Sequence, residues 1–100
     1  MTANGFRKIA LAIKGVVEGA HHGHPDFRVN GKVMASLHPG NERGMVVLTP
    51  EQQTEFVRDF PAFSPENGAW GRKGCTRVDL ATVDEEPLGL ALTLAKRNLK

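Results

Sequence analysis

Asn30 and Gly31 lie between two segments of extended character, and this arrangement restricts the fold more than any other feature of the sequence. Both residue types tolerate the positive φ that a two-residue type I′ turn requires, and the twist of that turn matches the twist of paired strands. We therefore expect a β-hairpin formed by residues 27–29 and 32–37. Its alternation predicts an apolar face of Phe27, Val29, Val33, Ala35 and Leu37 and a mixed face of Arg28, Met34 and Ser36.

Further strands are expected on both sides of the hairpin. Residues 45–48 are short and rich in valine, which is typical of a central strand and would complete a three-stranded meander. Residues 76–80 alternate small or apolar side chains with charged ones, which is typical of a strand with one buried and one solvent-exposed face. Residues 16–17 can open a short strand, whereas residues 19–25 contain two glycines and a proline and are expected to break regular structure.

Three segments have the periodicity or the capping residues of helices. Between Phe6 and Ile13, apolar residues recur at the i, i+3, i+4, i+7 spacing of a helix that lies on a core. At Thr49 the sequence has the pattern of a capping box, so a middle helix is expected to begin there and to end near residue 60. A third helix is expected from about Asp84, with a core stripe of Leu88, Ala91, Leu92, Ala95 and Leu99.

The segment between the middle helix and the last strand, residues 63–73, is rich in glycine, proline, serine and asparagine. It is expected to be a surface loop in which the side chains of Phe63 and Trp70 point toward the core. With one core expected for this length, residues 1–100 are predicted to form a single α+β domain. The predicted architecture is an antiparallel sheet meander with N-terminal, middle and C-terminal helices.

Composition limits the cellular setting. The single cysteine, Cys75, permits neither an intramolecular disulfide nor a four-thiolate metal site, and it fits a reducing compartment. No apolar run approaches the roughly 18 residues of a membrane span, and the apolar stretch at residues 9–13 is too short for a signal-peptide core. We therefore expect a monomeric, cytoplasmic protein. The net charge of +2 is too small to steer the whole molecule to a polyanion.

No catalytic signature is present in the sequence. Cys75 lies in neither a cysteine-protease nor a nucleophile-elbow pattern and is interpreted as a buried structural thiol. Glu85 and Glu86 suit the positive end of the last helix, and the glycine-rich residues 68–74 lack the Lys-Ser/Thr ending of a phosphate-binding loop. The sequence therefore predicts no enzyme and no cofactor.

Three neighbouring histidines, His21, His22 and His24, raise a metal-binding hypothesis because neutral imidazole is a common ligand of transition metals. Histidines this close in one turn seldom converge on a single ion without ligands from elsewhere. The favoured interpretation is a polar turn ahead of the hairpin, without metal. If a metal were bound, the additional ligands would come from His38, Asp26 or Glu18.

Positive charge gathers in two places. Residues 67–78 contain three basic side chains beside a tryptophan and no acidic residue, and two more basic side chains flank the turn of the hairpin. Such residues can lie along phosphates, or they can simply keep a surface soluble. The candidate nucleic-acid-binding residues are Arg28, Lys32, Trp70, Arg72, Lys73 and Arg77.

Three blocks, residues 24–37, 48–52 and 68–78, resemble the YjbR/MmcQ-like family of small bacterial proteins and occur in the family's order. The resemblance implies a compact α+β fold similar to the double-wing DNA-binding domain of a phage transcription activator, and more remotely to the frataxin-like shape. It implies DNA binding through the hairpin and the loop before the last strand, and it supplies no catalytic residue. Cys75 stands where the family is expected to have a bulky residue, often tryptophan.

Three functional hypotheses follow. The first is a weak DNA-binding accessory domain that uses the six candidate nucleic-acid-binding residues named above. The second is a protein-interaction module that uses Leu90 and Leu94, which lie off the core stripe of the last helix. The third is a small-ligand or metal-binding domain without catalysis, with its site near residues 21–24.

Overall fold

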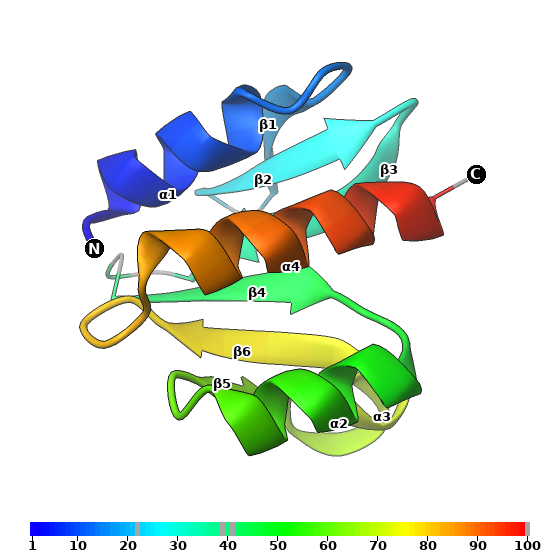
Figure 1. Ribbon diagram of the computed structural model, residues 1–100. Coiled ribbons are helices and arrows are strands. Elements are labelled where there is room, and N and C mark those ends of the chain that lie inside the picture. Colours follow the sequence, from blue (N-terminus) through cyan, green and yellow to red (C-terminus); the bar gives the residue numbers. More distant parts are fainter. Residues whose placement is uncertain (22, 39, 41, 100) are drawn as a thin grey trace.

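The computed structural model describes all residues except 22, 39, 41 and 100, and within them the chain forms four helices and six strands (Figure 1). Every strand pair is antiparallel, and one sheet contains the strands in the order β1-β2-β3-β4-β6-β5. The predicted α+β class, with N-terminal, middle and C-terminal helices, is confirmed. The elements are α1 (Ala3–Leu11), β1 (Val17–His21), β2 (His24–Val29), β3 (Lys32–Leu37), β4 (Arg43–Val47), α2 (Pro50–Asp59), β5 (Phe63–Pro65), α3 (Gly68–Arg72), β6 (Cys75–Asp79) and α4 (Glu85–Asn98).

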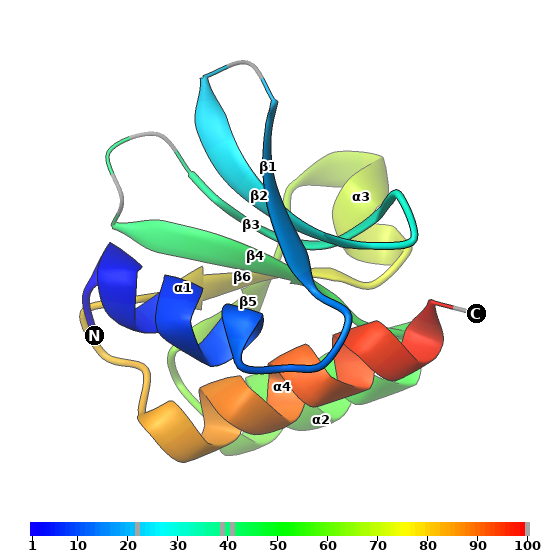
Figure 2. The same ribbon diagram turned by 90° about the horizontal axis from the view of Figure 1, so that it is seen from above.

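The helices divide unequally between the two faces of the sheet. Figure 2 shows α1, α2 and α4 on one face and the short α3 on the other. The core lies under the three longer helices, where Phe6 of α1 contacts Phe27 of β2 with ring centroids 5.7 Å apart. Gly44 of β4 permits this approach, because a Cβ there would lie 2.8 Å from the Phe6 ring. The other face of the sheet is left open apart from α3.

The three predicted helices are confirmed, with small changes in their bounds. The capping box at the start of α2 is complete: the Gln52 amide donates to Thr49 Oγ1 (3.2 Å), and the Thr49 amide donates to Gln52 Oε1 (3.0 Å). Four members of the stripe predicted for α4 are fully buried: Leu88, Ala91, Leu92 and Ala95. No helix in the described part of the chain has the length and apolar character that crossing a membrane requires.

The predicted hairpin is confirmed, with φ of 52° at Asn30 and 80° at Gly31. The predicted division of its faces is wrong for two residues, because β3 contains a β-bulge. Phe27 pairs with Ala35 and Arg28 pairs with Val33, so Met34 is an extra residue without a partner. The bulge places Met34 in the core and leaves Val33 on the open face.

The segment expected to break regular structure is instead a second hairpin. β1 and β2 pair from Val17 opposite Arg28 to His21 opposite His24, so Gly19 and Pro25 both lie within strands. Pro25 pairs with Ala20 of β1 but has no partner in β3, because the register between β2 and β3 starts at Asp26. A residue without an amide hydrogen is tolerated near the start of a strand, where one side is unpaired.

The segment from residue 63 to residue 73, expected to be a loop, contains the strand β5 and the helix α3. β5 has only three residues and pairs solely with β6, so its pattern is too short to stand out in the sequence. Phe63 is buried as expected, but Trp70 is 67% exposed and does not tuck inward. The exposed position of Trp70 on the open face defines the candidate site.

Candidate functional site

The open face of the sheet carries a row of side chains from consecutive strands. Strand pairing sets Asp26 of β2 opposite Ser36 of β3, Ser36 opposite Met45 of β4, and Met45 opposite Arg77 of β6. Directly paired residues project from the same face, so these four side chains lie across the open side of the sheet. The row joins two stretches of sequence that are far apart along the chain.

A pocket of about 690 Å³ lies on this face beside α3. We call it the Trp70 pocket. Its walls combine apolar side chains with a few polar ones, which is typical of small-molecule sites of several hundred Å³. Its lining residues are Val33, Ser36, His38, Met45, Val47, Glu66, Asn67, Trp70, Lys73 and Cys75.

The position of Trp70 depends on close backbone packing around α3. A Cβ on Gly71 would lie 1.8 Å from the Glu66 carbonyl oxygen, and one on Gly74 would lie 1.9 Å from the Leu48 carbonyl oxygen. The side-chain amide of Gln53 on α2 also donates to the carbonyl oxygens of Gly71 and Cys75, each at 3.0 Å. These contacts hold α3 and the residue pair after it against Glu66, Leu48 and α2, so the backbone that carries the exposed indole is closely packed.

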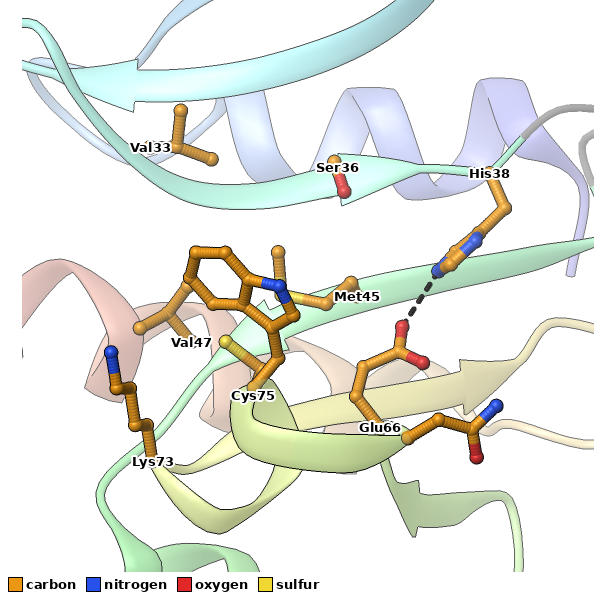
Figure 3. A pocket seen from close by; sticks show the side chains of 10 residues that line it. Val33, Ser36, His38, Met45, Val47, Glu66, Lys73 and Cys75 are labelled. Carbon is orange, nitrogen blue, oxygen red and sulfur yellow. Dashed lines mark hydrogen bonds and ion pairs between the residues drawn. The ribbon is translucent and has the colours of Figure 1, made fainter.

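One end of the Trp70 pocket holds a hydrogen-bonded group centred on Glu66 (Figure 3). His38 Nε2 donates to one carboxylate oxygen at 2.9 Å, and the Arg77 guanidinium donates to the other at 3.1 and 3.4 Å. Only 14% of the Glu66 side chain is exposed, and the Arg77 guanidinium balances the charge of its carboxylate. This end of the pocket can form hydrogen bonds with a ligand without presenting an unbalanced negative charge.

Lys73 lies at the other end of the pocket, away from His38 and Glu66 (Figure 3). Its amine is 5.5 Å from the centroid of the Trp70 ring, within the range of a cation–π contact. The nearby thiol of Cys75 is buried, as the sequence predicted, and burial raises its pKa. The charge of Glu66 raises that pKa further and the charge of Lys73 lowers it, so the thiol is affected by both ends of the pocket.

The structure brings together only part of the predicted nucleic-acid-binding set. Trp70, Arg72, Lys73 and Arg77 lie on α3, on the residue after it and on the adjacent β6. Arg28 projects from the same face of the sheet but on β2, three strand spacings or roughly 14 Å from β6. Lys32 pairs with the core residue Val29, so the alternation of the hairpin directs it to the face opposite Arg28.

The basic candidates also differ in their charge environment. Arg28 donates two hydrogen bonds to the buried carboxylate of Asp26, at 2.9 and 2.8 Å, and these bonds raise the pKa of the guanidinium. Arg77 forms an ion pair with one carboxylate oxygen of Glu66, at 3.1 Å. Within the described residues, neither Arg72 nor Lys73 forms an ion pair. Of the arginine candidates and Lys73, those without an ion pair in the described part of the chain are therefore Arg72 and Lys73, two residues close to Trp70 in sequence.

The metal hypothesis falls partly outside the described residues, which include neither His22 nor the side chain of His21. Among the side chains that the structure does describe, no group of three His, Cys, Asp or Glu residues is placed to hold a metal ion. The apolar surface expected on α4 is smaller than predicted: Leu90 is 52% exposed, but Leu94 is partly buried against the core.

Sequence analysis missed several residues of the Trp70 pocket. His38 and Glu66 are 28 residues apart in the sequence, and no local pattern connects them. Met45 and Val47 alternate with Val46 along β4, and only Val46 is fully buried. In the sequence the available signal was the unbroken apolar run Met45-Val46-Val47, because consecutive residues of a strand point to opposite faces and both faces are then apolar.

The Trp70 pocket thus has an aromatic wall, an apolar floor, one end rich in hydrogen-bonding groups and one cationic end. Such an arrangement can hold a flat, partly polar molecule. Comparison of the chain with protein-family models, with curated proteins and with solved structures finds no match.

Proposed function

We propose that this protein binds a small ligand with a flat apolar body in the Trp70 pocket, without catalysing a reaction. The observation that carries the proposal is Trp70 itself, a large aromatic side chain held 67% exposed above an apolar surface of the sheet. Leaving this much indole in water costs free energy, and a ligand that covers it recovers that free energy. Exposed aromatic surface at a pocket is typical of binding sites.

The polar groups of the pocket favour binding over catalysis. A general acid or base needs a proton-transferring group that can reach the substrate. Here the Glu66 carboxylate is engaged by His38 and Arg77, and the raised pKa of Cys75 keeps its thiol protonated and weakly nucleophilic near neutral pH. These groups support roles in shaping the pocket and in orienting a bound molecule.

A neutral aromatic probe, N-phenyl-1-naphthylamine, tests the proposal. Its fluorescence rises when it enters an apolar site, and the Trp70→Ala variant shows whether that site is the Trp70 pocket. We expect saturable binding that weakens about tenfold in Trp70→Ala, since aromatic contact and area burial together contribute roughly 1.4 kcal/mol.

Leu90→Ala is the matched control, because Leu90 is also an exposed apolar residue but lies on α4, away from the pocket. It is expected to bind the probe with unchanged affinity. Both variants should keep the wild-type unfolding temperature, since each truncates an exposed side chain. The proposal is wrong if Trp70→Ala binds the probe as the wild type does, or if the wild type binds neither this probe nor its anionic counterpart, 8-anilinonaphthalene-1-sulfonate.

A second candidate function is weak binding of nucleic acid. The observation that favours it is the consecutive pair Arg72 and Lys73, which have no carboxylate partner among the described residues and follow the exposed Trp70 closely in the chain. The Lys73 amine is 5.5 Å from the Trp70 ring. A base can stack on the indole while the cations contact phosphates, as in single-strand binding sites. The resemblance to the YjbR/MmcQ-like family and its double-wing domain supports the same proposal. Arg28, Lys32 and Arg77 are expected to contribute less, because of their pairing or their position.

Fluorescence anisotropy with labelled single-stranded and duplex DNA tests this candidate. With two phosphate contacts on duplex DNA, log affinity should fall with log salt at a slope of about −1.8, which is roughly a twelvefold loss from 50 to 200 mM. Replacing Arg72 and Lys73 by glutamate should abolish binding. The candidate fails if no binding occurs at tens of micromolar protein, or if the double variant binds as tightly as the wild type.

A further inference from the structure

We propose that the ligand of the Trp70 pocket carries an anionic group on its flat body, held at the mouth of the pocket by Lys73 with Arg72 nearby. This inference rests on the proposed small-ligand function and specifies its chemical class. The ligand is thus an aromatic carboxylate, sulfonate or phosphate ester, with its charge directed toward α3 and its ring against the indole.

The first support is the fixed position of Lys73. Its backbone amide donates to the carbonyl oxygens of Ala69 and Trp70, at 3.1 and 3.2 Å, so it caps the C-terminal end of α3. The next amide, of Gly74, donates to the Gly71 carbonyl at 3.1 Å. The amine lies 5.5 Å from the Trp70 centroid and forms part of the pocket wall. The backbone of Lys73 is therefore fixed, and its ammonium lies where a ligand packed against the indole would meet it.

The second support is the local balance of charge. The carboxylate in the pocket, Glu66, is already neutralised by Arg77 and also accepts a hydrogen bond from His38. Lys73 and Arg72 have no such partner among the described residues, so the pocket and its rim have an excess of positive charge. A concave apolar surface with an uncompensated cation at one end attracts an anion more strongly than an open surface does.

The third support is the separation of the two ends. Lys73 lies at one end and the hydrogen-bonding pair of His38 and Glu66 at the other, with apolar side chains such as Met45 and Val47 between them (Figure 3). A molecule that satisfies both ends is elongated: anionic at one end, apolar in its middle and capable of hydrogen bonds at the far end. A compact inorganic anion would meet only the first of these requirements.

Two fluorescent probes that differ by one charged group test the inference. 8-Anilinonaphthalene-1-sulfonate is anionic, and N-phenyl-1-naphthylamine has the same ring system without the sulfonate. We expect the wild type to bind the anionic probe about fivefold more tightly, the effect of one partly exposed ion pair. Raising the salt concentration should weaken binding of the anionic probe alone.

Lys73→Met keeps the length and apolar stem of the side chain and removes its charge. It should remove the preference for the anionic probe and leave the affinity for the neutral probe within about twofold of wild type. Lys14→Met is the matched control, because Lys14 is exposed and does not line the pocket, and it should preserve the preference. Displacement by 1-naphthoate and by 1-naphthyl phosphate, each compared with its neutral amide or alcohol, distinguishes a carboxylate from a phosphate ester.

The outcomes separate this inference from the function on which it rests. If the wild type binds both probes with equal affinity, or if Lys73→Met weakens both equally, the ligand is not anionic. Binding of a small ligand in the Trp70 pocket is not contradicted by either result. If neither probe binds the wild type, or if both bind Trp70→Ala unchanged, small-ligand binding at this pocket is wrong and the inference falls with it.

Discussion

The substitution Gly71→Ala tests the packing that holds α3 and Trp70 above the sheet. A Cβ at this position would lie 1.8 Å from the Glu66 carbonyl oxygen, whereas ordinary contacts of a Cβ begin at 3.4 Å. The shortfall of 1.6 Å (3.4 minus 1.8) involves backbone on both sides, so no side-chain rotation relieves it. Either α3 or the backbone at Glu66 must move, and the bond from Gln53 to the Gly71 carbonyl is strained or lost.

The expected cost is about 3 kcal/mol, combining roughly 2 for overpacking with about 1 for one hydrogen bond to a buried carbonyl. For a domain of this size, each kcal/mol lowers the unfolding midpoint by roughly 4 to 8 °C, so Tm should fall by roughly 12 to 24 °C. Displacement of α3 should also shift the fluorescence of Trp70 and weaken binding of N-phenyl-1-naphthylamine.

Gly89→Ala is the matched control for the added methyl group. Gly89 lies within α4, and a Cβ there would meet only Ile9, at an ordinary 3.9 Å. Alanine favours a helix interior over glycine by roughly 0.5 to 1 kcal/mol, so this variant should melt a few degrees above the wild type. Thermal unfolding followed by circular dichroism measures both. A Gly71→Ala protein that melts within about 3 °C of the wild type would refute the close packing of α3.

Three further predictions follow from individual contacts. Thr49→Ala removes half of the capping box and should cost about 1 kcal/mol in chemical denaturation, whereas Thr54→Ala, within the same helix, should be nearly neutral. Arg28→Met should lower Tm, because it leaves the buried Asp26 carboxylate without the guanidinium that donates two hydrogen bonds to it. Arg43→Met, at an exposed position, should leave Tm unchanged. Equal Tm values for the two variants would contradict the structural role of Arg28. Alkylation of Cys75 by iodoacetamide at pH 8 should be slower in the folded protein than in urea, because burial raises the thiol pKa. Replacing Lys73 by glutamine should slow it further, since the charge of Lys73 lowers that pKa; a faster reaction would contradict this.

Several expectations that depend only on neighbouring residues are confirmed by the structure. The turn at Asn30 and Gly31 and the cap at Thr49 each need only a few consecutive side chains. The stripe of α4 depends on helical spacing within one segment, and four of its five predicted members are buried in the core, whereas Leu99 caps the helix and is partly buried. The antiparallel α+β class followed from these local elements and from the alternation of strands 27–29, 32–37 and 76–80.

The departures share a different cause. Glycine and proline at residues 19–25 disfavour a strand locally, but the pairing of β1 with β2 supplies backbone hydrogen bonds that make this segment part of the sheet. The bulge at Met34 depends on the register between two strands, and a shift of one residue moves a side chain to the other face. The three-residue β5 exists because β6 offers it an edge.

The candidate site shows the same division. The sequence by itself determined that basic residues cluster around Trp70, because they are consecutive neighbours on the chain. Only the tertiary structure decided which of these charges are balanced, since Glu66 reaches Arg77 and His38 across strands that are distant in sequence. Likewise, strand order alone sets Met45 beneath the pocket and Arg28 far from Lys73. Turns and caps are fixed by short-range sterics and hydrogen bonds, whereas pockets and charge balance arise from contacts that exist only after the sheet has assembled.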